Sequence, residues 1–315
     1  MNNFNKYIIA ALTSASLFFT ANSFAGEKVN ETLPSAGVNA VTIENVSGKV
    51  TIIGWDKANV TVKGELDDKA EKLIFEQVGN TINIKVDMPN HSNWNSKGSE
   101  LVIHIPADIR MNFEGVSSNV ELENLRNNVT VKTVSGNIKA TKLQEHIELS
   151  SVSGNIKTNA LQGKITLASV SGNINDKNSQ GRIELQAVSG GIKADTKANE
   201  VIVNNVSGST ELHLAKVDEL RISSVSGDTI ARLFLQDNGV VKASTVSGEI
   251  ELDFQNNIAA DFRLKANAGG DLVNKLTKQK AERAKYGPSA KLYFQTGNAS
   301  SSVSVNTVSG DVVVK

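Results

Sequence analysis

The sequence predicts an all-β protein in which most of the chain winds into one parallel β-solenoid (β-helix) with coils of roughly 18 residues. The main observation is a recurring tripeptide. Val-Ser-Gly begins at Val46, Val134, Val152, Val170, Val188, Val206, Val225, Val246 and Val308. The copies from Val134 to Val206 are evenly spaced, and the degenerate Val116-Ser117-Ser118 precedes them by the same interval. Repetition at a fixed period is the signature of stacked structural repeats.

The second observation is the apolar pattern inside each coil. Ile147 and Leu149 stand two positions apart, as do Ile165 and Leu167 in the next coil, which is the spacing of one strand face. The alternation breaks before each Val-Ser-Gly, so the chain must bend there, and glycine accepts backbone angles that other residues resist. We expect stacked coils to bury a continuous column of Ile, Leu and Val. The predicted corner glycines are Gly48, Gly136, Gly154, Gly172, Gly190, Gly208, Gly227, Gly248 and Gly310.

Parallel stacking of such coils predicts a rod. About ten layers at roughly 4.8 Å each give a length on the order of 50 Å. An antiparallel β-sandwich is the main alternative fold. It explains neither the fixed interval between copies of the tripeptide nor the repeated placement of glycine.

Residues 1–25 have the pattern of a cleavable signal peptide. A short start ending at Lys6 precedes an uncharged apolar run, and Ser23-Phe24-Ala25 supplies the small residues that a signal peptidase reads. We expect cleavage before Gly26. The apolar run is too short to favour a membrane anchor, and the absence of cysteine excludes a lipid anchor. Since we recognise no sorting motif or translocator near Lys315, we expect a periplasmic protein, or one that is secreted or held at the cell surface.

The rest of the chain divides into residues 26–105 and 106–315. The first part is β-rich but less periodic, as in Ile82 to Val86, and we interpret it as a cap continuous with the solenoid. A separate small domain is the alternative. Met88 to Glu100 is expected to form an exposed loop. An insertion at 271–290 is expected to be helical over Asp271 to Lys285, because an apolar stripe precedes a basic one and Gly287-Pro288 would end the helix.

Three stretches resemble a known family. They are Gly48-Lys49-Val50-Thr51-Ile52-Ile53-Gly54-Trp55-Asp56, Val102-Ile103-His104-Ile105-Pro106, and the Ser-Gly-x-Ile corners that follow. The resemblance is to the putative adhesin family of bacterial β-strand-repeat domains of unknown function (the DUF4097 type), and it runs from about Val41 to Val314. It implies the fold and only weakly a function, because the family brings no established catalytic or ligand residues. The insertion near the C-terminus departs from a simple family pattern.

Composition and motifs point away from several functions. Lys plus Arg equals Asp plus Glu, 33 each, so no global field would attract nucleic acid. Without cysteine there are no disulfides or thiolate sites. The histidines His91, His104, His146 and His213 fall in no metal-ligand spacing. We therefore predict no catalytic, cofactor or metal site, and no membrane span in the mature chain.

The polar residues that repeat from coil to coil are predicted to have structural roles. The serines of Val-Ser-Gly, and Asn137, Asn155 and Asn173, are expected to form hydrogen-bonded ladders along the rod. Trp55 follows an apolar strand and is expected to pack on the cap. Trp94 lies in the polar loop, so it is the candidate for ligand contact.

We therefore expect an exported, non-enzymatic envelope protein, adhesin-like in type. Its β-solenoid would present a binding or structural surface to an envelope polysaccharide or another envelope protein. One alternative is a polysaccharide-active β-helix enzyme, although the acids Glu148, Glu184 and Glu211, which alternate with Thr166 at an outer position, have no aromatic companions. The other alternative is a periplasmic envelope-stress or assembly factor.

Overall fold

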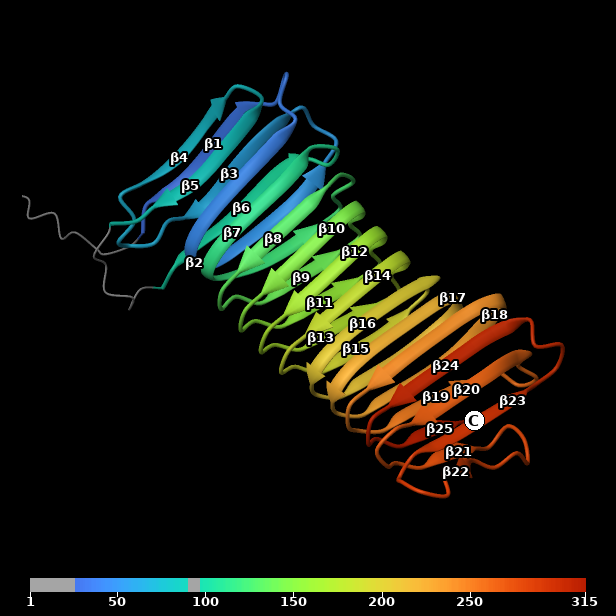
Figure 1. Ribbon diagram of the computed structural model, residues 1–315. Coiled ribbons are helices and arrows are strands. Elements are labelled where there is room, and N and C mark those ends of the chain that lie inside the picture. Colours follow the sequence, from blue (N-terminus) through green and yellow to red (C-terminus); the bar gives the residue numbers. More distant parts are fainter. Residues whose placement is uncertain (1–25, 90–96) are drawn as a thin grey trace, which may run out of the picture.

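The computed structural model describes residues 26–89 and 97–315, and within them all regular secondary structure is strand (Figure 1). The strands are β1 (Lys28–Pro34), β2 (Ala40–Trp55), β3 (Asn59–Glu65), β4 (Lys72–Val78), β5 (Thr81–Asp87), β6 (Ser99–Pro106), β7 (Arg110–Glu123), β8 (Val129–Thr133), β9 (Ile138–Thr141), β10 (Gln144–Ser151), β11 (Ile156–Asn159), β12 (Gln162–Ser169), β13 (Ile174–Lys177), β14 (Gln180–Ala187), β15 (Ile192–Thr196), β16 (Glu200–Ser207), β17 (Thr210–Ser226), β18 (Thr229–Thr245), β19 (Ile250–Phe254), β20 (Ala260–Ala266), β21 (Leu272–Asn274), β22 (Glu282–Arg283), β23 (Ala290–Gln295), β24 (Ser301–Thr307) and β25 (Val312–Val314). The predicted all-β class is confirmed.

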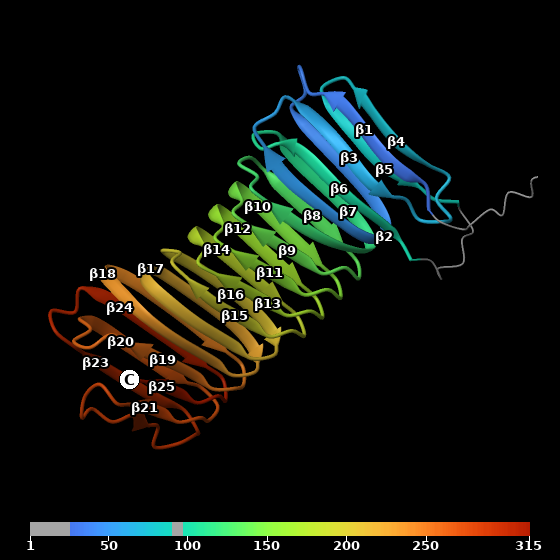
Figure 2. The same cartoon turned by 180° about the vertical axis from the view of Figure 1, so that it is seen from behind.

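Each regular coil contributes one strand to each of two parallel sheets, as Figures 1 and 2 show from opposite sides. In the long-strand sheet, β10 pairs in parallel with β8 and β12. In the short-strand sheet, β11 pairs in parallel with β9 and β13. The register follows the sequence repeat, so that Ile147 stands beside Ile165. The chain therefore winds round its own core, and parallel neighbours need no long crossover connections.

Alternate residues of the strands fill the space between the two sheets. In the coil of β10 and β11, the side chains of Ile147, Leu149 and Ile156 are fully buried. Their counterparts in neighbouring coils continue the same columns, and one hydrophobic cluster extends from Val29 to Val314. Because one coil has only a few apolar residues, this core exists only through stacking. The predicted column of Ile, Leu and Val is present.

The two ends of the rod are not built in chain order. Near the N-terminus, β2 lies between β7 on one side and β5 and β6 on the other. Beyond them, β1, β3 and β4 pair in antiparallel fashion. Near the C-terminus, β24 lies between β18 and β20, and β25 lies between β19 and β21. The strands of 26–105 thus continue the sheets of the repeat region through the β2–β7 pairing.

The prediction of a helix within the insertion at 271–290 is wrong. This segment contains β21 and β22 and turns between them. Leu272 is buried as the inward residue of β21, which pairs in parallel with β25. The Oδ1 atom of Asn274 accepts hydrogen bonds from the backbone N–H groups of Leu276 and Thr277 at 3.0 and 3.1 Å, closing a turn where the helix was expected. No helix that could cross a membrane occurs in the described residues.

Candidate functional site

The corner glycines lie where successive coils approach most closely. A Cβ atom on Gly172 would lie 2.0 Å from the carbonyl oxygen of Gly154, and one on Gly190 would lie 2.0 Å from that of Gly172. The φ angles of these glycines are outside the left-handed region, so glycine is needed there for space. The φ angles of Gly208 and Gly248, 132° and 107°, do lie in the region that favours glycine. The backbone angle, which was the expected reason for glycine at the corners, thus explains glycine at only some of them.

A polar residue that the repeat pattern did not predict caps most of these corners. In the coil of β12, the buried Ser169 Oγ donates to the Gly154 carbonyl at 3.2 Å and accepts from the Gly172 N–H at 2.9 Å. Ser151, one coil earlier, makes the same pair of contacts. The sequence signal is a hydroxyl or amide residue directly before the valine of Val-Ser-Gly. Ala187 is the exception among the regular coils.

One of the two predicted polar ladders is present. The Asn137 and Asn155 side-chain amides each donate to the asparagine of the preceding coil, at 3.1 and 3.2 Å, and Asn155 Oδ1 accepts from the backbone N–H of Asn173. The serines of Val-Ser-Gly in the regular coils instead connect through their backbone. The N–H group of Ser153, for example, donates to the Val134 carbonyl at 2.8 Å.

Apart from the half-buried Val46, the valines of Val-Ser-Gly are exposed, which corrects the expectation that valine at these positions joins the buried column. In the long-strand sheet, each takes the outward position that follows the last inward residue before the corner, because outward positions alternate with buried ones up to that point. Backbone hydrogen bonds connect neighbouring corners, so the valines stack in one line. Between 37% and 48% of each residue is exposed. We call this line the valine row: Val116, Val134, Val152, Val170, Val188, Val206, Val225, Val246 and Val308.

A shallow apolar groove of about 490 Å³ accompanies part of the valine row. Val134, Val152 and Val170 form one wall, and the small side chains of Ser150 and Ala168 lie beside them. In the same outward line, the next two coils carry Gln186 and Asn204. The line is therefore uncharged over the four coils from Ser150 to Asn204, whereas Glu114 and Lys132 continue it at the N-terminal end of the groove. Such a surface can accommodate an extended chain that runs parallel to the rod.

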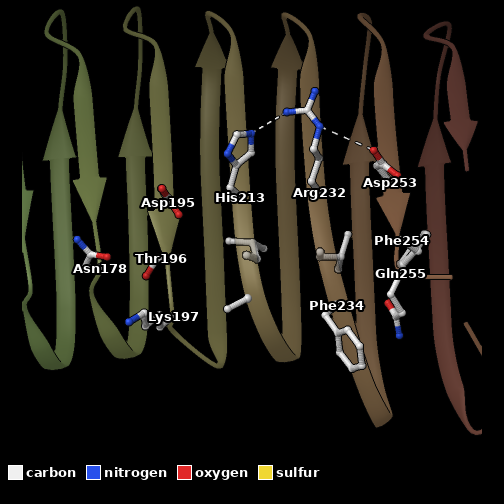
Figure 3. Close-up of a pocket in the computed structure, with 13 residues that line it drawn as sticks. Asn178, Asp195, Thr196, Lys197, His213, Arg232, Phe234, Asp253, Phe254 and Gln255 are labelled. Atoms are coloured by element: carbon white, nitrogen blue, oxygen red, sulfur yellow. Dashed lines mark hydrogen bonds and ion pairs between the residues drawn. The ribbon is translucent and has the colours of Figure 1, made fainter.

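A second hollow, of about 450 Å³, lies on the short-strand sheet toward the C-terminal part (Figure 3). We call it the polar trough. One side is a line of outward residues from successive coils, in which the pairing places Asp195 beside His213, His213 beside Arg232 and Arg232 beside Asp253. The other side is formed by Lys197, Ala215, Phe234 and Gln255. Phe234 is 45% exposed.

Charges in the first line of the polar trough are connected. Arg232 Nη1 lies 2.7 Å from His213 Nε2, so this nitrogen accepts from the guanidinium, which can only donate. Arg232 Nε lies 3.7 Å from the Asp253 carboxylate. Next to this line, the hydrogen bond from Lys193 lowers the pKa of Glu211. A carboxyl with a lowered pKa suits an ion pair better than a general acid.

One carboxyl with a raised pKa lies inside the rod. Asp176 is fully buried at an inward position of β13 and accepts hydrogen bonds from Thr158 and Ser179, both at 2.5 Å. Burial raises its pKa, although these hydrogen bonds oppose the shift. Its Oδ2 atom has no hydrogen-bond partner among the described residues. Because Asp176 does not reach the surface, it is a feature of stability and not of a reacting site.

The remaining residues considered in the sequence are dispersed. Trp55 is half-buried, donates from Nε1 to the Asn59 carbonyl at 2.9 Å, and packs against His104 with ring centroids 4.8 Å apart. Burial and nearby lysines lower the pKa of His104. His146 lies at an outward position of β10, and His213 alone enters the polar trough. Trp94, the candidate for ligand contact, and His91 lie outside the described residues.

The acids weighed for an enzyme do not share one line. Glu148, Thr166 and Glu184 stand side by side in the long-strand sheet, whereas Glu211 lies in the short-strand sheet beside Lys193. The described residues contain no cluster of His, Asp or Glu side chains suited to hold a metal ion.

Several solved structures and one family model are similar to this chain. The structures include a putative adhesin from Parabacteroides merdae (11% identity, TM-score 0.45, covering 73% of this chain and 94% of that one). Others are a putative adhesin from Bacteroides fragilis (12%, 0.40, 92% and 97%) and a putative lipid binding protein from Parabacteroides distasonis (14%, 0.42, 92% and 98%). A search of curated proteins finds no match. The Toastrack DUF4097 family model matches residues 38–315, and the chain therefore belongs to the Toastrack DUF4097 family.

Proposed function

We propose that the protein is an exported, non-enzymatic binding protein of the cell envelope, and that it holds an extended partner along the valine row. The observation that carries this proposal is the row itself. Nine apolar side chains face solvent in one line over most of the rod. Contiguous apolar surface on a soluble protein commonly marks an interaction site, and repeat proteins offer such surfaces to extended partners.

The fold itself does not require valine at these positions. A β-branched residue suits the end of a strand, but threonine would meet that preference without exposing two methyl groups. About half of each of these valines is buried, and the rest remains open to solvent. The polar capping of the corner comes from the residue before the valine, as at Ser169, and not from the valine. A partner that covers the row would account for the choice of an apolar residue.

Binding is proposed in preference to catalysis because of the charges at the surface. Glu211, Arg232 and Asp253 are held in ion pairs, and the carboxyl whose pKa is raised, Asp176, is buried in the core. A glycoside-cleaving site would need an accessible carboxyl with a raised pKa facing a second carboxylate. An envelope-stress or assembly role remains compatible with a binding surface, since the partner would then be another envelope protein.

Export is proposed from the signal-peptide pattern, and the site of action can be tested directly. The mature protein isolated from cells should begin at Gly26. Protease added to intact cells, and to cells whose outer barrier has been opened, then separates the two locations. Digestion on intact cells would support an adhesin-like surface protein. Protection until the barrier is opened would support a periplasmic role.

The binding proposal is tested by changing three neighbouring members of the valine row. Replacing Val152, Val170 and Val188 with threonine keeps the β-branched shape and removes apolar surface. Each remaining exposed half is worth about 1 kcal/mol when buried by a partner, so the triple variant should bind about 100-fold more weakly. Replacing the same residues with isoleucine is the matched control and should retain binding.

The measurement is capture of partners from an envelope extract by the purified protein, with a glycan array in parallel. Partners should be enriched by the wild type and the isoleucine variant and lost with the threonine variant. Empty results from both assays, or equal capture of every envelope-extract partner by all three proteins, would overturn the proposal.

A further inference from the structure

We propose that the polar trough is a second binding site, separate from the valine row, for a short stretch of an uncharged sugar polymer. Three properties of the trough support this assignment: its shape, its one exposed phenyl ring, and the balance of its charges.

The shape suits a linear ligand. The trough crosses four successive strands of the short-strand sheet, β15, β17, β18 and β19, between two lines of outward side chains (Figure 3). Neighbouring strands lie roughly 4.8 Å apart, so the trough is on the order of 15 Å long. Ala215, which also lines the trough, has only a methyl side chain and fills little of it, and the pairing places Lys216 beside Phe234. The ligand would therefore run along the rod axis, with one or two polymer units over each pair of coils.

Phe234 supplies the apolar contact. It points outward from β18, is 45% exposed, and lies in the line that also contains Lys197 and Gln255. A sugar ring has one face of C–H groups, which packs against an aromatic ring while its hydroxyl groups remain at the edge. Aromatic side chains provide large contact areas at little cost in conformational entropy. In the described residues, no other Phe, Tyr or Trp side chain lies in the two lines that form the trough.

The rest of the trough provides hydroxyl-binding groups with no net charge. The side chains of Asp195 and Lys197 make no hydrogen bond or ion pair with other described residues, so one free acceptor group and one free donor group face the trough. Arg232 is shared between His213 and Asp253 and retains further N–H groups. Because each cation is balanced by a carboxylate, the trough has no preference for a polyanion or a polycation. Hydroxyl groups can both donate and accept, and so match both kinds of side chain.

Gln255 holds the trough in shape and is not counted as a ligand group. Its amide donates to the Leu235 carbonyl at 2.8 Å and its Oε1 accepts from the Leu235 N–H at 3.0 Å. Both functions of the amide are occupied by the strand that carries Phe234. The ring is thus presented on a braced strand, which limits the ordering cost of binding.

The test uses the full mature chain and an array of neutral, acidic and basic oligosaccharides, followed by titration calorimetry with the neutral oligosaccharide that gives the strongest signal. Replacing Phe234 with alanine should weaken binding about tenfold, and replacing it with tryptophan should preserve binding. Ile230→Ala is the matched control, because Ile230 is an exposed apolar residue of the same strand outside the trough. That variant should bind like the wild type.

Two further measurements separate this proposal from others. Binding of a neutral sugar should be nearly independent of salt, whereas binding driven by charge falls as salt rises. The threonine variant of the valine row should bind the oligosaccharide normally, so failure of one proposal does not affect the other. An array on which no neutral oligosaccharide binds, a stronger response to charged ones, or unchanged binding by Phe234→Ala would each overturn the assignment.

Discussion

At the corner of each regular coil, one glycine determines how closely two layers can stack. The carbonyl oxygen of the preceding corner leaves no room for a Cβ atom. A Cβ on Gly190, for example, would lie 2.0 Å from the carbonyl oxygen of Gly172. The neighbouring Gly191 is different, because a Cβ there would first meet the Asn173 side chain at 3.3 Å. Neither residue has a φ angle in the left-handed region, so space alone distinguishes them.

This difference predicts the outcome of two alanine substitutions. Gly190→Ala should lower the free energy of unfolding by more than about 2 kcal/mol, because backbone must move to admit the methyl group. Gly191→Ala should change it by less than about 1 kcal/mol. Chemical denaturation of both variants measures the contrast. Equal stabilities would show that close stacking does not explain the corner glycine.

A second residue-scale prediction concerns Asp176. Burial raises its pKa, so at pH values between the ordinary and the raised pKa the folded protein holds a proton that the unfolded chain has lost. Stability therefore falls as the pH rises through the raised pKa, and below the ordinary aspartate range the penalty is absent. Asp176→Asn keeps an acceptor for Thr158 and Ser179 but cannot ionise.

Thermal unfolding at about pH 4 and about pH 8 tests whether Asp176 makes stability depend on pH, since this range spans ordinary and raised carboxyl pKa values. The melting temperature of Asp176→Asn relative to the wild type should be higher at the upper pH than at the lower. Asp68→Asn serves as the control, because Asp68 is exposed, and it should show no such trend. A relative stability of Asp176→Asn that does not change with pH would refute the role assigned to the buried carboxyl.

At the scale of elements, the link between a strand and its corner is a hydrogen-bonded cap. Ser169, the last residue of β12, satisfies the N–H of Gly172. Ser169→Ala leaves this buried donor without a partner and should cost about 1–3 kcal/mol. The last residue of β14 is already an alanine, Ala187. The reverse change, Ala187→Ser, should stabilise the protein by about 1 kcal/mol.

Denaturation midpoints of these two variants, with the double variant as a further check, test the cap. The two coils are neighbours, so the double variant also shows whether the caps act independently. Stabilisation by Ser169→Ala, or loss of stability in Ala187→Ser, would contradict the capping role.

Strand elements were predictable from sequence where the repeat is regular, and less so elsewhere. The alternation around Ile147 and Ile165 corresponds to β10 and β12 because inward residues of every coil enter the same core. The exposure of Val152 was not predictable from its apolar character, since a corner changes which side of the chain faces inward. The helix expected over Asp271 to Lys285 is absent, because the pairing of β21 with β25 prevails over the helical preference of a short apolar stripe.

At the scale of the whole molecule, the rod is closed at both ends by strands out of chain order. β2 enters between β6 and β7, and β24 enters between β18 and β20. These insertions were not predictable, because the repeat shows which residues share a register but not which late segment returns to pair with an earlier coil. Antiparallel partners then cover the parallel edge, as β23 covers β20, which limits strand addition from another chain.

The candidate sites also belong to this scale, because each exists only through the stacking of several coils. The sequence contains every valine of the row and every residue of the polar trough. Their alignment into lines follows from the pairing register. His213 and Arg232, for example, are brought together by one step of that register, although no motif marks them in the sequence.

If the valine row contacts a partner in the cell, site-specific photo-crosslinking will capture that contact. A photoreactive residue is placed in turn at Val152, Val170 and Val188 of the row, and at Lys157 and Asn175 on the outward face of the short-strand sheet. Light-dependent adducts of the same partner are expected from all three positions of the row and none from the two control positions. Adducts only from the short-strand sheet, or none from the row in cells that express the protein normally, would contradict it.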